Sequence, residues 1–302
     1  MLSGYFINAV CTLLNEDETL NVDGLEAHLA DQWEQGTDGV LVGGSMGAMQ
    51  LLRDATYRDL VERSVAVSKG RGEVLVGAGD TSFGRTMDRI TFLNDKPIDG
   101  VVVLTPYMRP IPSQERLVAY YECLADACKS PFYLYDVPGL TGVSLDIDTY
   151  MTLSKHPNIK GAKISGRFMV SRHLVDQLGD DFRVIIAEPD MADLALRGGF
   201  EQQLDGIFSI APHWLRLLRE AAAADDWDSA GQYAQRFVNL RVLLMATASV
   251  LAAATPLLNA RGISGNAFLR PVRALSEEAK QKLMDDPTVK ELVGGERVTG
   301  NE

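Results

Sequence analysis

The stretch GVLVGGSMG, residues 39–47, indicates the fold of this 302-residue chain. Its first four residues are apolar without alternation, which is typical of a β-strand covered on both faces, as in a parallel sheet. The glycines and the serine that follow are typical of a turn. A helical pattern comes next, over residues 53–69, where Leu60, Val61 and Val65 fall at helical spacing. The stretch therefore predicts a strand–turn–helix unit.

Similar apolar runs recur along the chain. They predict eight strands, over residues 5–13, 39–42, 73–77, 100–104, 132–135, 159–163, 183–187 and 206–210. Helical patterns lie between them and are clearest over residues 22–35, 53–69 and 113–130. This repeated alternation favours an α/β fold with a closed (β/α)8 TIM barrel. An open doubly wound sheet is the alternative, but it would require a nucleotide-binding fingerprint at a strand end, and none is convincing.

The chain beyond the eighth expected strand has helical patterns over residues 214–224, 227–254 and 276–293. One helix completes the barrel. We therefore expect a barrel over residues 1–224 and a C-terminal helical extension over residues 225–302, packed together as one compact unit. The uncharged stretch 242–258 falls just short of the ~18 residues of a membrane span, so it predicts a buried or subunit-facing helix.

Charge and composition exclude several classes of function. The chain has 41 acidic and 29 basic residues, a formal charge of −12 and 46% hydrophobic residues. It is globular and lacks the excess of lysine and arginine that binding to nucleic acid or to an anionic membrane requires. Its three cysteines, Cys11, Cys123 and Cys128, have no framework spacing and indicate free thiols in a reducing compartment. Since the N-terminus does not resemble a signal peptide, we expect a cytoplasmic protein with no nucleic-acid or membrane partner.

Lys163 is the first candidate for a catalytic residue. Catalytic groups of such a barrel lie where the strands end, and Lys163 ends the sixth expected strand. A lysine is costly in a run buried on both faces, but desolvation favours the neutral amine that attacks a carbonyl carbon. The alternative is a structural lysine that reaches the barrel rim and pairs with a carboxylate such as Glu188.

Tyr135 and Ser45 are the next candidates, at the ends of the fifth and second expected strands. A phenol can carry a proton to and from a carbinolamine or a substrate oxygen. A hydroxyl beside successive backbone N–H groups can hold a small carboxylate. The alternatives are an amphipathic aromatic at the barrel rim and a plain turn capped by Ser45. With Lys163, these residues predict imine chemistry on a 2-oxo acid.

Four motifs then point to a family: GGSMG (43–47), TPYMRP (105–110), YDVPGLTG (135–142) and IKGAKIS (159–165). In this order and at these spacings they resemble the dihydrodipicolinate synthase/N-acetylneuraminate lyase family of class I Schiff-base aldolases, and the likeness covers nearly the whole chain. The resemblance implies a (β/α)8 barrel with a C-terminal helical extension, a homotetramer (a dimer of dimers), and a lyase that acts on a pyruvate-type 2-oxo acid. It also implies no metal and no external cofactor, because the substrate would be held as a covalent imine with Lys163.

The same resemblance implies roles for individual residues. Lys163 would be the Schiff-base lysine, Tyr135 the proton-transfer tyrosine and Ser45 its partner in a proton relay. The substrate-binding residues would be Gly44, Met46, Tyr107, Leu140, Gly206 and Ile207.

Departures from the family pattern bear on the second substrate. Leu140 stands where the synthase has an arginine that grips a carboxylate, Met46 and Ala48 alter the turn, Met108 replaces an aromatic, and Asp136 replaces an asparagine. These changes predict a substrate without a distal carboxylate, unless Arg109 or Arg167 turns into the pocket instead. The leading expectation is aldol cleavage or condensation of a 2-keto-3-deoxy sugar acid. The alternatives are a dehydratase, a deaminase or a dihydrodipicolinate synthase-like activity through the same imine, and a degenerate barrel that binds a 2-oxo acid without catalysis.

Overall fold

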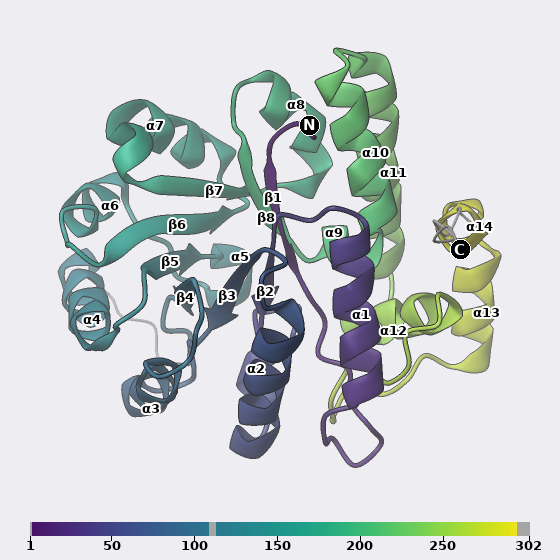
Figure 1. The fold of residues 1–302 in the computed structure, drawn as a ribbon, viewed down its shortest axis with the longest axis horizontal. Coiled ribbons are helices and arrows are strands. Elements are labelled where there is room, and N and C mark those ends of the chain that lie inside the picture. The colour runs from purple at the N-terminus through teal and green to yellow at the C-terminus, as the bar shows by residue number, and fades with distance from the viewer. Residues whose placement is uncertain (1, 109–112, 295–302) are drawn as a thin grey trace.

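The structure is a computed structural model that describes residues 2–108 and 113–294. Eight parallel strands form a closed barrel in the order of the chain, and β8 pairs with β1 (Figure 1). The strands are β1 Tyr5–Ala9, β2 Gly39–Val42, β3 Glu73–Gly77, β4 Gly100–Leu104, β5 Phe132–Asp136, β6 Ile159–Ser165, β7 Arg183–Ala187 and β8 Gln202–Asp205. The predicted (β/α)8 barrel is confirmed.

Helices surround the barrel and continue beyond it (Figure 1). They are α1 Val22–Glu34, α2 Asp54–Ser68, α3 Phe83–Leu93, α4 Gln114–Ala127, α5 Pro138–Thr141, α6 Ile147–Leu153, α7 Phe168–Leu178, α8 Ala192–Arg197, α9 Ile207–Ile210, α10 Pro212–Ala223, α11 Trp227–Met245, α12 Val250–Ala260, α13 Glu277–Asp285 and α14 Pro287–Gly294, with the short 3-10 turns η1 Met49–Leu51, η2 Gly179–Asp181 and η3 Pro189–Met191. Several begin at a side-chain cap, as when the Ser82 hydroxyl accepts the N–H of Arg85 at the start of α3.

The prediction for the eighth strand was wrong. The strand is Gln202–Asp205, and the apolar residues 207–210 form the short helix α9. The strand was not recognised because it contains two glutamines, Gln202 and Gln203. Their side chains form hydrogen bonds with residues on β7 and α8. The Gln202 side-chain Oε1 accepts from the Arg183 Nε at 2.7 Å, and the Gln203 side-chain Nε2 donates to the Ala192 backbone carbonyl at 3.0 Å. These contacts satisfy the Gln202 Oε1 and the Gln203 Nε2, although the Gln203 Oε1 has no partner among the described residues, so a buried strand here does not require apolar residues.

Two long expected helices are each divided. The one over residues 227–254 breaks between α11 and α12, where the Ser249 hydroxyl caps α12 by accepting the N–H of Ala252. The one over residues 276–293 breaks between α13 and α14, where Pro287 opens a new helix. The apolar stretch 242–258 therefore spans two helices. In the described residues, no helix has the length and apolar character needed to cross a membrane.

A chain of aromatic rings packs the C-terminal helices onto the barrel. Phe6 on β1 meets Phe208 on α9 with ring centroids 5.4 Å apart, and Phe208 meets Phe237 on α11 at 5.2 Å. Trp214 on α10 completes the group at 6.0 Å from Phe237. All four side chains are buried, and their edge-on contacts add to the area that they bury. Figure 1 shows α10 and α11 side by side next to the barrel, with α13 and α14 at the far edge.

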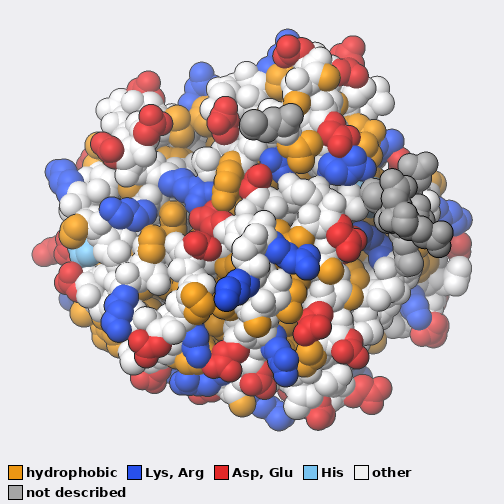
Figure 2. Space-filling view, viewed as in Figure 1, with side chains coloured by type: hydrophobic (Ala, Val, Ile, Leu, Met, Phe, Trp, Pro, Cys, Tyr) orange, Lys and Arg blue, Asp and Glu red, His pale blue; other side chains and the backbone are white. Residues whose placement is uncertain are grey.

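Charged side chains of both signs are interspersed on the surface. On the face shown in Figure 2, lysine and arginine alternate with aspartate and glutamate among scattered apolar side chains. Although the whole chain has a formal charge of −12, this face carries acidic and basic side chains together.

Candidate active site at the carboxyl ends of the strands

Lys163 lies inside the barrel near the end of β6. The strand register places it opposite Tyr135 on β5 and Ile185 on β7. The side chain is buried at 3% exposure, and its Nζ lies 4.2 Å from the centroid of the Tyr135 ring. Within the described part of the chain no carboxylate lies within ion-pair distance of this Nζ, and Glu188 is not its partner. The amine is therefore sheltered from water and is not consumed by an internal salt bridge.

Tyr135 connects the lysine to the β2 turn. Its ring is buried at 4% exposure, and its hydroxyl lies 3.0 Å from the Ser45 hydroxyl. Either group could donate this hydrogen bond. The structure thus brings Lys163, Tyr135 and Ser45 together from three strand ends, in the order that a proton relay to the amine site requires.

The turn after β2 has backbone groups free to bind an anion. The N–H of Ala48 donates to the Ser45 carbonyl at 3.1 Å, and the N–H of Met49 donates to the Gly44 carbonyl at 3.3 Å. The N–H groups of Met46 and Gly47, between these two bonds, have no acceptor among the described residues. Ala48 holds the left-handed conformation, with φ of 51°, that bends the turn. Consecutive free N–H groups beside a hydroxyl suit a small carboxylate.

The other expected binding residues line the same end of the barrel. The Met46 side chain packs on Gly206, where an added Cβ would lie only 2.7 Å from the Met46 Cγ. Ile207 is buried at the start of α9, directly after Gly206. Tyr107 is half-buried beyond β4, and its buried hydroxyl has no partner among the described groups. Burial raises the pKa of this phenol, with a smaller contribution from Asp80. Leu140, on α5, is 56% exposed.

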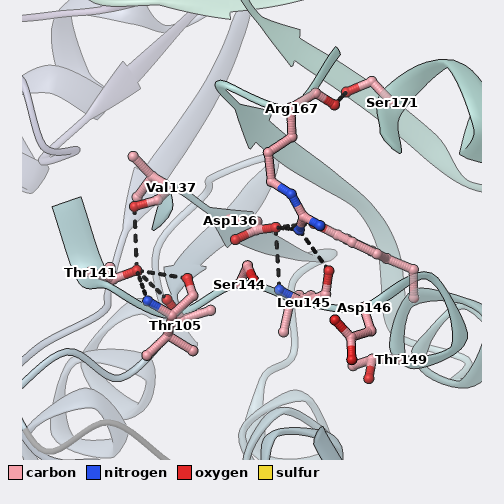
Figure 3. Close-up of polar contacts among 12 residues, drawn as sticks. Thr105, Asp136, Val137, Thr141, Ser144, Leu145, Asp146, Thr149, Arg167 and Ser171 are labelled. Carbon is pink, nitrogen blue, oxygen red and sulfur yellow. Dashed lines mark hydrogen bonds and ion pairs between the residues drawn. The ribbon is translucent and has the colours of Figure 1, made fainter. Parts of the chain in front are cut away.

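Arg167 does not turn toward a substrate. Its Nη1 donates to the Asp136 carboxylate and to the Leu145 carbonyl, both at 2.6 Å (Figure 3). Asp136 is completely buried, and burial raises its pKa against the hydrogen bonds from Tyr150 and Arg167. Arg167 is therefore occupied by an internal carboxylate. Arg109, the other arginine considered as a substitute clamp, lies outside the described residues.

A group of charges lies at the ends of β7 and β8, and sequence reasoning missed two of its members, Asp205 and Arg241. Burial raises the pKa of Asp205, while the positive charge of Lys163 acts in the opposite direction. Burial also raises the pKa of Glu188, opposed by the backbone N–H groups of Arg167 and Gly166 and by the charge of Arg241. Arg241, from α11, forms an ion pair with Asp190 on η3. Asp205 was missed because the eighth strand was misplaced, and Arg241 because it belongs to the C-terminal helices.

Comparisons with known proteins agree with this architecture. The model of the dihydrodipicolinate synthetase family matches residues 2–290. A 4-hydroxy-tetrahydrodipicolinate synthase from an Exiguobacterium strain is 27% identical over 277 residues, covering 91% of this chain and 94% of that protein. Among solved structures, a chloride-inhibited dihydrodipicolinate synthase from Acinetobacter baumannii in complex with pyruvate matches with a TM-score of 0.85 and 24% identity, over 97% of this chain and 99% of that one. An N-acetylneuraminate lyase from Proteus mirabilis matches with a TM-score of 0.86 and 20% identity, over 94% and 97%.

Proposed function

Since this chain belongs to the dihydrodipicolinate synthetase family and is a pyruvate-dependent lyase of the class I aldolase type, we propose that Lys163 forms an imine with a 2-oxo acid. The enzyme would then cleave or form the carbon–carbon bond next to that imine. One observation carries the proposal: Lys163 is buried, has no ion-pair partner among the described residues, and faces a tyrosine whose hydroxyl is hydrogen-bonded to Ser45.

The geometry supports the following sequence of steps. The Lys163 amine attacks the ketone carbon of the substrate, and Tyr135 supplies the proton with which the carbinolamine oxygen leaves as water. Tyr135 then takes the proton of the substrate's C4 hydroxyl, the C3–C4 bond breaks, and an aldehyde leaves. The bonding electrons remain as an enamine, which is protonated at C3 and hydrolysed to pyruvate and free Lys163. Tyr135 would supply the proton at C3 and regain it when water adds to the pyruvate imine, and Ser45 would relay that returning proton, so that Tyr135 is a phenolate when it takes the C4 proton.

The turn after β2 would hold the carboxylate of the 2-oxo acid. We assign this role to the N–H groups of Met46 and Gly47 together with the Ser45 hydroxyl, because they are adjacent and the N–H groups lack internal acceptors. A carboxylate held there would place its neighbouring ketone carbon toward Tyr135 and Lys163. Gly44, Gly206 and Ile207 would complete the walls of this small site.

The second half of the substrate would carry no carboxylate. Leu140 cannot donate hydrogen bonds, and Arg167 is bound to Asp136. We therefore propose a 2-keto-3-deoxy sugar acid, or a related aldol, as the substrate. Dehydration or deamination through the same imine would use the same residues, as would a dihydrodipicolinate synthase-like condensation or a barrel that binds a 2-oxo acid without turnover. These activities are outcomes of the experiment below.

Borohydride trapping tests the imine. With pyruvate, we expect an irreversible mass increase on Lys163 that is absent in Lys163→Ala. Lys160→Ala is the matched control, because Lys160 lies on the same strand but is exposed. A panel of 2-oxo acids and aldehydes, followed by pyruvate release, then identifies the reaction. No adduct with any 2-oxo acid would overturn the proposal, and an adduct without turnover across the panel would identify a binding protein instead.

For the assembly we propose a homotetramer, as the resemblance implies. Apolar side chains at the barrel mouth support an interface there, since Leu51 is 55% exposed and Met108 is 63% exposed. Light scattering of the purified protein tests this, and a monomeric mass would overturn it.

A further inference from the structure

We propose that Arg167 and Asp136 are positioning residues that hold residues 137–145, and with them Leu140, over the distal half of the substrate site. This inference rests on the proposed aldol reaction for its substrate. It assigns specificity to a buried ion pair that does not itself touch the reacting atoms.

The pair lies directly behind the catalytic residues. Asp136 follows Tyr135 on β5, and the strand register places it opposite Ile164, the residue after Lys163. Because side chains alternate along a strand, Asp136 points away from the barrel interior that Tyr135 and Lys163 face. The carboxylate can therefore fix the neighbouring chain without entering the site. Arg167 reaches it from the start of α7.

Together the two side chains bind both backbone groups of Leu145. The N–H of Leu145 donates to the Asp136 Oδ2 at 3.4 Å, and its carbonyl accepts from the Arg167 Nη1 at 2.6 Å. The same Oδ2 accepts from the Arg167 Nη1 at 2.6 Å (Figure 3). It also accepts from the Tyr150 hydroxyl at 2.8 Å. The far end of the segment is thus attached to β5 and to the chain that follows β6.

The middle of the segment is attached to Thr105, the residue that follows β4. The Thr105 hydroxyl donates to the Thr141 hydroxyl at 2.9 Å, and the Thr141 hydroxyl lies within hydrogen-bond distance of the Val137 carbonyl (Figure 3). The Val143 carbonyl also lies within hydrogen-bond distance of the Thr141 hydroxyl. Leu140 lies one residue before this anchor, on the four-residue helix α5. With Thr141 and Leu145 both fixed, the backbone that carries the exposed Leu140 side chain has a defined position.

The charges of Asp136 and Arg167 explain why residues 137–145 are held firmly and why Arg167 is not available to bind a substrate. Asp136 is completely buried, and its Oδ1 has no partner among the described groups. A buried carboxylate needs a charge partner, and Arg167 provides one at 20% side-chain exposure. As long as Asp136 is ionised, the guanidinium is held there and is not available to bind a substrate carboxylate. The pair would thus favour neutral aldehydes, because it holds Leu140 over the distal half of the site and keeps the Arg167 guanidinium away from the substrate.

The test uses Arg167→Gln and Asp136→Asn, with Arg172→Gln as the matched control on the exposed side of the same helix. We expect both variants to form the pyruvate–Lys163 adduct at a rate within about twofold of wild type. We expect kcat/KM for the aldol substrate to fall about tenfold or more, mainly through KM, because misplacing a substrate-contacting residue by 1 Å has effects of this size. Arg167→Lys should recover part of the loss, and the double variant should be no worse than the poorer single variant.

Two measurements separate this inference from the proposed function and from a general loss of folding. Hydrogen exchange of residues 137–145 should be faster in Arg167→Gln than in wild type, whatever the reaction is. Thr141→Val breaks the other anchor without exposing a buried charge, and it should also raise KM. Unchanged exchange and unchanged KM in these variants would overturn the inference, as would equal losses of adduct formation and turnover. Absence of the adduct in wild type would overturn the proposed function alone.

Discussion

Replacing Tyr135 with phenylalanine tests the proton relay most directly. The substitution keeps the ring against which the Lys163 Nζ lies at 4.2 Å, and it keeps the packing of a residue that is 4% exposed. It removes a single hydroxyl and its 3.0 Å hydrogen bond with Ser45. The lysine, its burial and the turn after β2 that we propose to bind the carboxylate are unchanged.

The expected losses of stability and of activity differ greatly. A hydrogen bond of this kind contributes about 1 kcal/mol net to stability, and the Ser45 hydroxyl is not fully buried and can find water. General acid–base catalysis by one group contributes about 10²–10⁴-fold in rate, equivalent to about 3–5 kcal/mol of transition-state stabilisation. Turnover should therefore fall at least about a hundredfold, while the free energy of unfolding changes by about 1 kcal/mol.

The assay combines steady-state turnover with borohydride trapping. Tyr135→Phe should still form the pyruvate adduct, more slowly than wild type, because the amine remains. Ser45→Ala is the control, since it removes the same hydrogen bond but leaves the phenol, and its turnover should fall less. If Tyr135→Phe kept turnover within about threefold of wild type, general acid–base catalysis by this phenol would be refuted.

Two further predictions concern stability. Burial, with a smaller contribution from Arg261, lowers the pKa of His28 to about 3 from 6.5. The contribution of neutral His28 to the free energy of unfolding is therefore present above pH 6.5 and is lost as the pH falls toward 3. Between pH 7 and pH 5, this histidine alone should lower the free energy of unfolding by about 2 kcal/mol. Urea titrations should show a weaker pH dependence in His28→Gln, and an equal dependence would contradict the assignment. Arg183 binds both carboxylate oxygens of Glu73 at 2.6 and 3.0 Å at the amino ends of β7 and β3. Arg183→Met should lower the free energy of unfolding by about 3 kcal/mol and leave kcat unchanged at temperatures where the variant is folded. A fall in kcat at those temperatures would show that this ion pair, at the amino ends of the strands, affects the active site.

The expected strands were predictable where the sequence was locally apolar. Runs such as residues 39–42 and 100–104 are buried on both faces, so their composition alone marks them. The eighth strand was not predictable in this way, because Gln202 and Gln203 are polar and residues 207–210 are a better apolar run. The glutamines are accommodated by Arg183 and by a carbonyl of α8, which local sequence does not indicate.

In the candidate site, too, some residues were predictable from local sequence and others were not. Lys163 and Tyr135 each end an apolar run, and the parallel order of β5 and β6 places such ends together. The charges around them could not be predicted in the same way. Arg241 reaches Asp190 from 51 residues away, and the coupling of Asp205 to Lys163 depends on where β8 ends.

The sequence by itself determined the barrel, its repeated units and the position of a lysine, a tyrosine and a serine at strand ends, because each depends on a short run of neighbouring residues. Only the tertiary structure decided which charges are paired. Arg167 and Asp136 are 31 residues apart, and their choice of each other follows from closure of the barrel around a carboxylate that water cannot reach. The free energy of a buried charge depends on all the groups brought around it, whereas the apolar pattern of a strand is carried by the strand itself.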